Sequence, residues 1–160
     1  MDKDIPQAAK ELIGIEKERA YTVTERDIHR FAQAIGDSNP LYHDPEFGKQ
    51  TRYGSMVSPP LFGHAFAFED VPPEALPPDG SPVEADVPIP AKRMVGGGSV
   101  FESYIRFRPG DTLRVRAKIK DLYTKAGRSG LLYFIVHETC FYNQRDELAA
   151  KETATFIKRV

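Results

Sequence analysis

A short segment at residues 36–44, with the sequence GDSNPLYHD, holds the side chains of this chain that are best suited to exchange protons with a ligand. It contains the carboxylates of Asp37 and Asp44, the amide of Asn39, the phenol of Tyr42 and the imidazole of His43. Histidine ordinarily titrates near neutral pH, whereas tyrosine, with an ordinary pKa of about 10, is a poor base there. These residue types suit acid/base chemistry, and which of them face one another decides what the segment can do.

The segment before this loop, TERDIHRFAQAIG from Thr24 to Gly36, is predicted to form an amphipathic helix. Its T-x-x-D start is typical of a capped helix, because the Asp27 carboxylate can accept hydrogen bonds from free N–H groups there. Its apolar side chains recur at i, i+3, i+4 and i+7, namely Ile28, Phe31, Ala32 and Ile35. Asp37 should therefore follow a helix end, in a loop that Asn39-Pro40 and Asp44-Pro45 stiffen.

The middle of the chain contains an aromatic, uncharged segment followed by a proline-rich one. Residues 60–68, PLFGHAFAF, are aromatic and uncharged and begin with a proline, which predicts a buried central helix. Residues 70–92 follow with prolines at positions 72, 73, 77, 78, 82, 88 and 90, too many for a helix or a central strand. We expect a long surface loop there, of the kind that often covers a cleft.

The last part of the chain predicts an antiparallel meander, with strands at 98–108, 112–123, 131–143 and 149–159. The second strand should have one buried and one solvated face, because Leu113, Val115, Ala117 and Ile119 alternate with Arg114, Arg116, Lys118 and Lys120. The third is apolar in both alternating sets, so we expect a helix to cover one face and another subunit or the rest of the core to cover the other. A helix followed by such a meander predicts an α+β fold.

Composition and net charge limit the classes of binding partner that this chain is expected to have. The 160 residues suit one domain, spanning 1–160, with ordinary hydrophobic (41%) and charged (28%) fractions. A net charge of -1 argues against non-specific binding to nucleic acid or an acidic membrane. The single cysteine, Cys140, excludes an internal disulfide, and we expect no metal centre and no cofactor. The charged N-terminal residues and the absence of a long apolar window favour a cytoplasmic location without signal peptide or membrane span.

The segment from Gly36 to Asp44 resembles the catalytic loop of the MaoC-like dehydratases and (R)-specific enoyl-CoA hydratases, which reads G-D-x-N-P-x-H-x-D. The resemblance extends over nearly the whole chain and implies a dimeric hot-dog fold, in which an antiparallel sheet wraps around a central helix. It implies addition of water to, or removal from, an acyl thioester of coenzyme A (CoA) or acyl carrier protein. This chemistry needs a base, an acid and donors for the thioester oxygen. Asp37 would be one acid/base group, and Asn39 would position a water or a loop carbonyl.

Two departures separate this chain from the catalytic members of the family. The histidine of the motif is replaced by Tyr42, and a histidine follows one place later, at His43. A shift by one residue along an extended segment turns a side chain to the opposite side, so we expect His43 to face solvent or the neighbouring strand. Catalytic members also begin the central helix with His-Gly, whose glycine N–H donates to the thioester oxygen. That place falls here on Pro59-Pro60, and Pro60 has no N–H to donate.

Other residues fit the resemblance less directly. His64 either lines the acyl tunnel or is a buried histidine bonded to a backbone carbonyl, while His29 is expected at the surface. The run from Gly96 to Ser99 resembles the glycine-rich strand entry of non-catalytic MaoC-like domains, where the strand starts close to its partner. The basic residues 114–120 either contact CoA phosphates or form a solvated face.

A loop with tyrosine before histidine also resembles that of non-catalytic N-terminal MaoC-like domains and of companion subunits in heteromeric hydratases. We therefore expect a hydratase/dehydratase subunit that shapes the acyl-binding tunnel, with Asn39, Tyr42, Pro60 and His64 near the substrate. A homologous MaoC-like partner would carry the intact aspartate and histidine, and Asn39 and Asp44 would cap backbone groups in the loop. Two alternatives stay open, a homodimeric hydratase that uses Asp37 and His43, and a non-enzymatic acyl-CoA-binding or scaffolding subunit.

Overall fold

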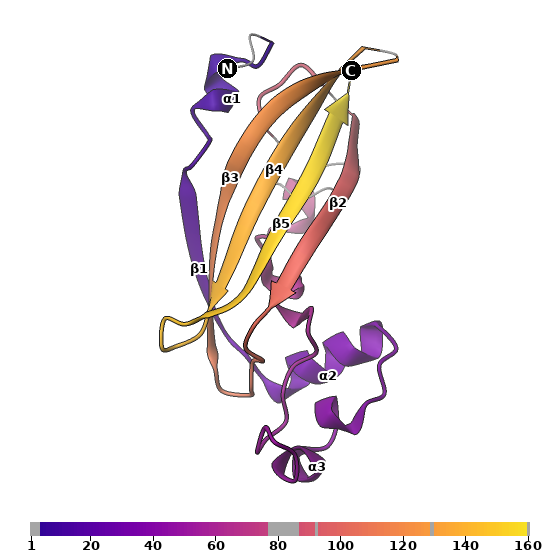
Figure 1. The fold of residues 1–160 in the computed structure, drawn as a ribbon, viewed down its shortest axis with the longest axis vertical. Coiled ribbons are helices and arrows are strands. Elements are labelled where there is room, and N and C mark those ends of the chain that lie inside the picture. Colours follow the sequence, from indigo (N-terminus) through magenta and orange to yellow (C-terminus); the bar gives the residue numbers. More distant parts are fainter. Residues whose placement is uncertain (1–3, 77–86, 92, 129, 160) are drawn as a thin grey trace.

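The computed structural model describes residues 4–76, 87–91, 93–128 and 130–159, and its framework is one antiparallel sheet of five strands (Figure 1). In spatial order the strands run β1-β3-β4-β5-β2. Their bounds are β1 (Glu16–Thr22), β2 (Arg93–Ser103), β3 (Thr112–Gly127), β4 (Gly130–Tyr142) and β5 (Leu148–Arg159). The order leaves β1 and β2 as the two edges, and β2 pairs with the last strand of the chain.

The four predicted strands are confirmed, although β2 begins and ends five residues earlier than the sequence pattern indicates. The pattern does not predict β1, because its residues EKERAYT are mostly exposed and lack an apolar alternation. Its backbone pairs with β3 all along its length, from Glu16 opposite Lys118 to Thr22 opposite Thr112. On β4, alternate residues are buried and the others are half-buried, so this chain fully covers one of the two faces.

Glycines in β2 let this edge strand approach β5 closely. The register shifts between Gly96 and Gly98, and a Cβ at Gly97 would lie 3.1 Å from both the Ile157 side chain and the carbonyl oxygen of Thr155. Only glycine fits this contact without displacing its neighbours. The close approach predicted from the glycine run is confirmed, although the run lies within β2 and not at its start, because the strand begins at Arg93.

The helix before the loop, α2 (Glu25–Ala34), forms as predicted. The Thr24 hydroxyl accepts from the Asp27 N–H at 3.1 Å, and the Asp27 carboxylate accepts from the Thr24 N–H at 2.9 Å, so the capping box is complete. Ile28 and Ala32 are buried, whereas Ile35 lies just past the helix end and is exposed. Two shorter helices are α1 (Gln7–Lys10) and α3 (Pro45–Lys49). Among the described residues, no helix has the length and apolar character needed to cross a membrane.

The predicted central helix at 60–68 is reduced to a short 3₁₀ helix, η2 (Phe62–Phe66). Prolines at 59–60 and 72–73 bound the segment, and Gly63 has low helix propensity, so little more than one turn forms. The turn still occupies the centre of the fold, because Phe62 is buried in a core cluster that includes Leu113 and Val115 of β3 and Phe141 of β4.

The proline-rich segment at 70–92 is only partly a surface loop. Residues 71–76 are exposed or half-buried, and residues 77–86 lie outside the described part of the chain. Val87 and Ala91, however, are buried in a second core cluster with Ala9 of α1 and Ile135 of β4. The expectation of a loop on the surface throughout is therefore wrong at its C-terminal end, because these apolar side chains fill the space between α1 and the sheet.

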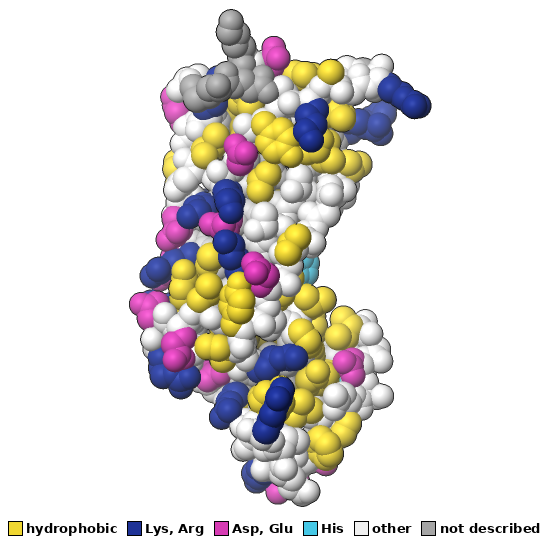
Figure 2. All heavy atoms as spheres, in the orientation of Figure 1, with side chains coloured by type: hydrophobic (Ala, Val, Ile, Leu, Met, Phe, Trp, Pro, Cys, Tyr) yellow, Lys and Arg dark blue, Asp and Glu magenta, His cyan; other side chains and the backbone are white. Residues whose placement is uncertain are grey.

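The molecule is hollowed on one side, next to the β2 edge and above the end that carries α2 and α3 (Figures 1 and 2). Hydrophobic side chains border this hollow in the space-filling view (Figure 2). The β2 edge and its exposed apolar residues thus lie beside a concave surface.

Candidate functional site

The loop after α2 is held by its own polar side chains. The Asp37 N–H donates to the Ala32 carbonyl at 2.9 Å, and the Asp37 carboxylate accepts from the Asn39 N–H at 3.0 Å. The Asn39 side chain accepts from the Leu41 N–H at 3.0 Å and caps the 3₁₀ helix η1 (Pro40–Tyr42). The Asp44 carboxylate accepts from two N–H groups at the start of α3, at 2.8 and 3.2 Å. The capping predicted for Asn39 and Asp44 is confirmed, and Asp37 has a similar structural bond.

The His43 side chain folds back over this loop. Its Nε2 lies 2.8 Å from the carbonyl oxygen of Asp37, so the ring does not face away as the sequence leads us to expect. The reason is local, because residues 40–42 form a 3₁₀ turn and not an extended segment. In a 3₁₀ turn, successive side chains differ by about 120° and not by half a turn.

A surface pocket of about 470 Å³ brings Asp37 and His43 together, with His29, Gln33, Gly36 and Ser38 as the other lining residues. The His29 and His43 rings stack with their centroids 5.5 Å apart. His29 Nε2 is buried and has no hydrogen-bond partner among the described residues, although the sequence places this histidine at the surface. The sequence could have indicated that His29 lines this pocket, because it lies four residues before Gln33 and so on the same side of α2, the side that meets the loop. All six lining residues are polar or glycine.

Tyr42 does not line this pocket. Its side chain is 6% exposed and belongs to the main core cluster, with Phe62 and Met56 among its members. Pro60, also predicted near the substrate, is exposed before η2, whereas Pro59 is buried and its carbonyl accepts from the Phe62 N–H at 3.2 Å. The structure therefore places Tyr42 in the hydrophobic core, apart from the pair formed by Asp37 and His43.

His64 forms a pair with a carboxylate that the sequence did not single out. Its Nδ1 lies 2.8 and 3.0 Å from the two carboxylate oxygens of Glu152 on β5. The Glu152 side chain is 3% exposed, whereas that of His64 is 51% exposed. Hydrogen bonding to Glu152 raises the pKa of His64, and partial burial opposes this shift. His64 is thus neither fully buried nor bonded to a backbone carbonyl.

Replacing His64 with alanine should destabilise the protein, because the buried Glu152 carboxylate would lose its partner. We expect a loss of about 1–3 kcal/mol in the free energy of unfolding, measured by urea denaturation. His64→Gln, which keeps a donor, is the matched control. Because the folded pKa of His64 lies above its unfolded value of about 6.5, the ionic part of this stabilisation is complete below pH 6.5 and fades as the pH rises through the folded pKa. A difference between wild type and His64→Ala that grows above neutral pH would contradict this account.

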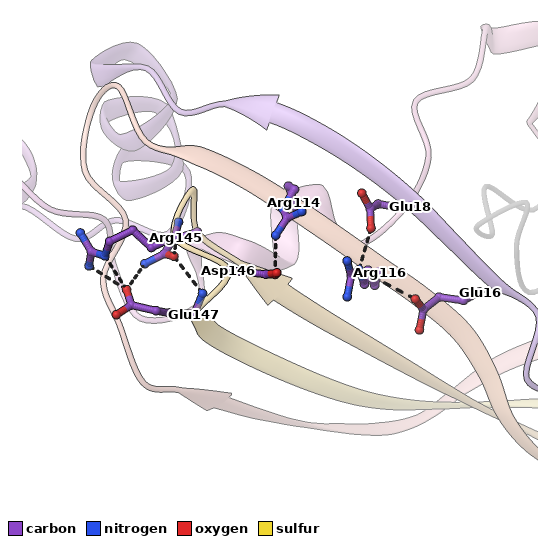
Figure 3. Close-up of polar contacts among 8 residues, drawn as sticks. Glu16, Glu18, Arg114, Arg116, Arg145, Asp146 and Glu147 are labelled. Atoms are coloured by element: carbon purple, nitrogen blue, oxygen red, sulfur yellow. Dashed lines mark hydrogen bonds and ion pairs between the residues drawn. The ribbon is translucent and has the colours of Figure 1, made fainter.

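The basic residues of β3 are paired with carboxylates (Figure 3). Arg114 pairs with Asp146, and Arg116 Nε lies 2.6 Å from Glu18 and 3.9 Å from Glu16. Lys118 and Lys120 contact the Glu138 carboxylate at 3.5 and 2.8 Å. Hydrogen bonds from Lys120 and Lys151 lower the pKa of Glu138 to about 2. The positive charges of this run are thus balanced by carboxylates on the surface of the sheet. This agrees with the interpretation of residues 114–120 as a solvated face.

The described residues contain no group of three or more histidine, cysteine, aspartate or glutamate side chains that could hold a metal ion. An antiparallel five-stranded sheet packed around a short central helical segment, with a capped polar loop after the preceding helix, defines the class of hot-dog proteins.

Comparison with known proteins gives the family. A model of the FAS1-like dehydratase domain region matches residues 11–152, and the chain belongs to this family of MaoC-like dehydratases. A protein from Streptomyces avermitilis known as a UPF0336 protein is 32% identical over 108 residues, which cover 67% of each chain.

Solved structures share the fold. The R-hydratase PhaJ1 from Pseudomonas aeruginosa superimposes with a TM-score of 0.68 at 19% identity, covering 94% of this chain and 84% of the other. The ChsH1-ChsH2 complex from Mycobacterium tuberculosis gives a TM-score of 0.73 at 18% identity, with coverage of 95% and 89%. The predicted hot-dog fold is confirmed, and the family is one of hydratases and dehydratases.

Proposed function

We propose that this chain is a subunit of an acyl-thioester hydratase/dehydratase, in which it shapes the acyl-binding tunnel beside a homologous MaoC-like subunit that carries the intact aspartate and histidine. The substrate would be an enoyl or 3-hydroxyacyl thioester of CoA or acyl carrier protein. The observation that carries this proposal is the burial of Tyr42, which is 6% exposed in the core. Because the side chain at this motif position points into the core, the loop presents no acid/base group there.

The surroundings of Asp37 support the same proposal. Its carboxylate accepts the Asn39 N–H, and its carbonyl oxygen lies 2.8 Å from the His43 ring, so both groups stabilise the loop. Pro60, which has no N–H, cannot supply the oxyanion donor at its place.

The β2 edge offers a surface for the partner subunit. It is an edge strand of eleven residues, from Arg93 to Ser103, and no other strand of the described residues pairs with its outer backbone groups. Val95 and Val100 are 47% and 65% exposed, and Tyr104 just beyond the strand is 53% exposed. A long exposed edge strand that carries exposed apolar side chains favours addition of a strand from another subunit. The hollow beside β2 would then lie at the subunit interface, where both chains could wall an acyl tunnel.

One observation favours the homodimeric alternative. Asp37 and His43 line the same pocket, so the displaced histidine lies close enough to act with the aspartate if the loop opens. In that case the chain would be active without a second kind of subunit.

Variants of Asp37 separate the two proposals. In the complex with its catalytic partner, Asp37→Asn should keep enoyl-CoA hydration within about threefold of wild type, because the amide oxygen still accepts the Asn39 N–H. Asp37→Ala loses this bond and should lower the free energy of unfolding by about 0.5–2 kcal/mol, as loss of a comparable cap does. If Asp37→Asn abolishes turnover while the protein stays folded, Asp37 is catalytic and the homodimeric alternative gains.

A further inference from the structure

A surface pocket of about 640 Å³ lies away from the Asp37 loop and is rich in arginine. Three parts of the chain form it, namely the segment after α3, the connection from β2 to β3, and the hairpin between β4 and β5. Its side chains include Arg52, Tyr53, Arg106, Arg108 and Arg145. Lys and Arg side chains are visible at the end of the molecule that carries α2 and α3 (Figure 2).

Three of these arginines have no carboxylate partner among the described residues. Arg52 donates to the Tyr53 hydroxyl at 2.9 Å and lies over the Tyr53 ring at 4.9 Å from its centroid. Arg106 donates to the Ser58 carbonyl at 3.2 Å, and Arg108 is exposed. Arg145, in contrast, is paired with Glu147 (Figure 3). The pocket thus differs from the β3 face, where Arg114 and Arg116 are matched by carboxylates.

The negative charge in the pocket is small. Asp111 is its acidic lining residue, and its carboxylate accepts from the Arg108 N–H at 2.7 Å and from the Gln144 amide at 2.8 Å. The hydrogen bond and positive charge of Arg52, with the charge of Arg106, lower the pKa of Tyr53, although desolvation opposes this shift. The pocket therefore has a positive potential, which concentrates anions.

We propose that this pocket binds the phosphoester end of the pantetheine carrier that presents the acyl thioester. Guanidinium groups bind phosphate oxygens through paired N–H donors, and three of them without carboxylate partners suit a group with more than one negative charge. The pocket begins at Ser103, where the β2 edge ends, so a carrier bound here would extend along the edge that the proposed partner covers. This inference rests on the proposed function, because it takes the carrier to be CoA or the arm of a carrier protein.

The test is calorimetric titration of the full chain with four ligands, namely CoA, dephospho-CoA, 4'-phosphopantetheine and pantetheine. CoA should bind, and pantetheine should bind at least about tenfold more weakly, with the affinity for CoA falling as ionic strength rises. Weaker binding of dephospho-CoA than of CoA would assign the site to the 3'-phosphate of CoA. Equal binding of CoA and phosphopantetheine would assign it to the single phosphoester that carrier proteins share.

The double variant Arg52→Gln/Arg108→Gln should weaken binding of CoA by about tenfold or more, because both side chains are exposed donors to charged oxygens. Arg114→Gln removes the same charge from a paired site on β3 and should leave the affinity within about twofold. Thermal unfolding of each variant would verify that it is folded. Equal affinity of wild type and double variant, or binding of pantetheine as tight as that of CoA, would overturn the inference.

This outcome is distinguishable from failure of the proposed function. If the complex with a MaoC-like partner is active but the double variant binds CoA normally, the phosphate site is refuted and the proposed function stands. If the chain forms no active complex but the double variant loses CoA, the phosphate site stands and the proposed function is refuted.

Discussion

The chain by itself is expected to hydrate crotonyl-CoA or longer enoyl-CoA at least about a thousandfold more slowly than the complex it forms with a MaoC-like subunit whose loop reads G-D-x-N-P-x-H. A missing general acid/base group typically costs about 10²–10⁴ in rate, and a missing oxyanion donor about 10²–10³. This chain lacks both at the family positions, because Tyr42 is buried in the core and Pro60 has no N–H. The partner would supply the acid/base group from its loop and the oxyanion donor from the start of its central helix.

Co-expression with a MaoC-like subunit that carries the intact loop, followed by steady-state hydration assays over a series of enoyl-CoA chain lengths, measures this ratio. The partner alone is the control, because it reveals how much the present chain adds to turnover and to chain-length preference. Full turnover by the isolated chain would support the homodimeric hydratase. Acyl-CoA binding without turnover, alone or with the partner, would support the scaffolding alternative.

Restoring the family motif with Tyr42→His is expected to destabilise the protein and to produce no gain in hydration rate. The ring at position 42 packs in the core, so the substitution would leave a void and bury an imidazole. Loss of a large buried side chain costs about 3–5 kcal/mol when it is cut back to alanine, and a smaller ring recovers only part of this. Burying a polar group without a hydrogen bond adds about 1–3 kcal/mol. We therefore expect a total loss of about 2–4 kcal/mol in urea denaturation.

Tyr42→Phe is the matched control for this prediction, because it keeps the ring and should cost less than about 1.5 kcal/mol. A Tyr42→His variant that is as stable as wild type and hydrates enoyl-CoA faster would show that the side chain at position 42 reaches the substrate. The burial of Tyr42 would then not explain why the loop lacks a motif histidine.

Local patterns in the sequence predicted local structure well. The T-x-x-D cap at Thr24 and the apolar alternation of β3 each involve residues near one another in the chain, and both predictions are confirmed. The predictions of secondary structure and burial failed where contacts between distant parts of the chain determine the structure. The exposed residues of β1 carry no apolar pattern, and backbone pairing with β3 holds them in a strand. Val87 and Ala91 lie in a proline-rich segment, yet core contacts bury them.

In the candidate site, too, the sequence predicted local contacts but not those between distant residues. The role of Asn39 and Asp44 as caps follows from their types and neighbours, and it is confirmed. His43 was misplaced because alternation applies to an extended segment, and this loop contains a 3₁₀ turn. The partner of His64 is Glu152, 88 positions later, and no local pattern links two residues at such a separation.

The most direct test of the proposed division of labour compares two alanine variants in the reconstituted complex, one at the loop histidine of the partner and one at His43 of this chain. Both complexes would be assayed for enoyl-CoA hydration, with assembly verified by size-exclusion chromatography. We expect the partner's variant to lose about 10²–10⁴ in rate and His43→Ala to keep activity within about threefold of wild type. A large loss in His43→Ala with the assembly intact, and little change in the partner's variant, would contradict the account.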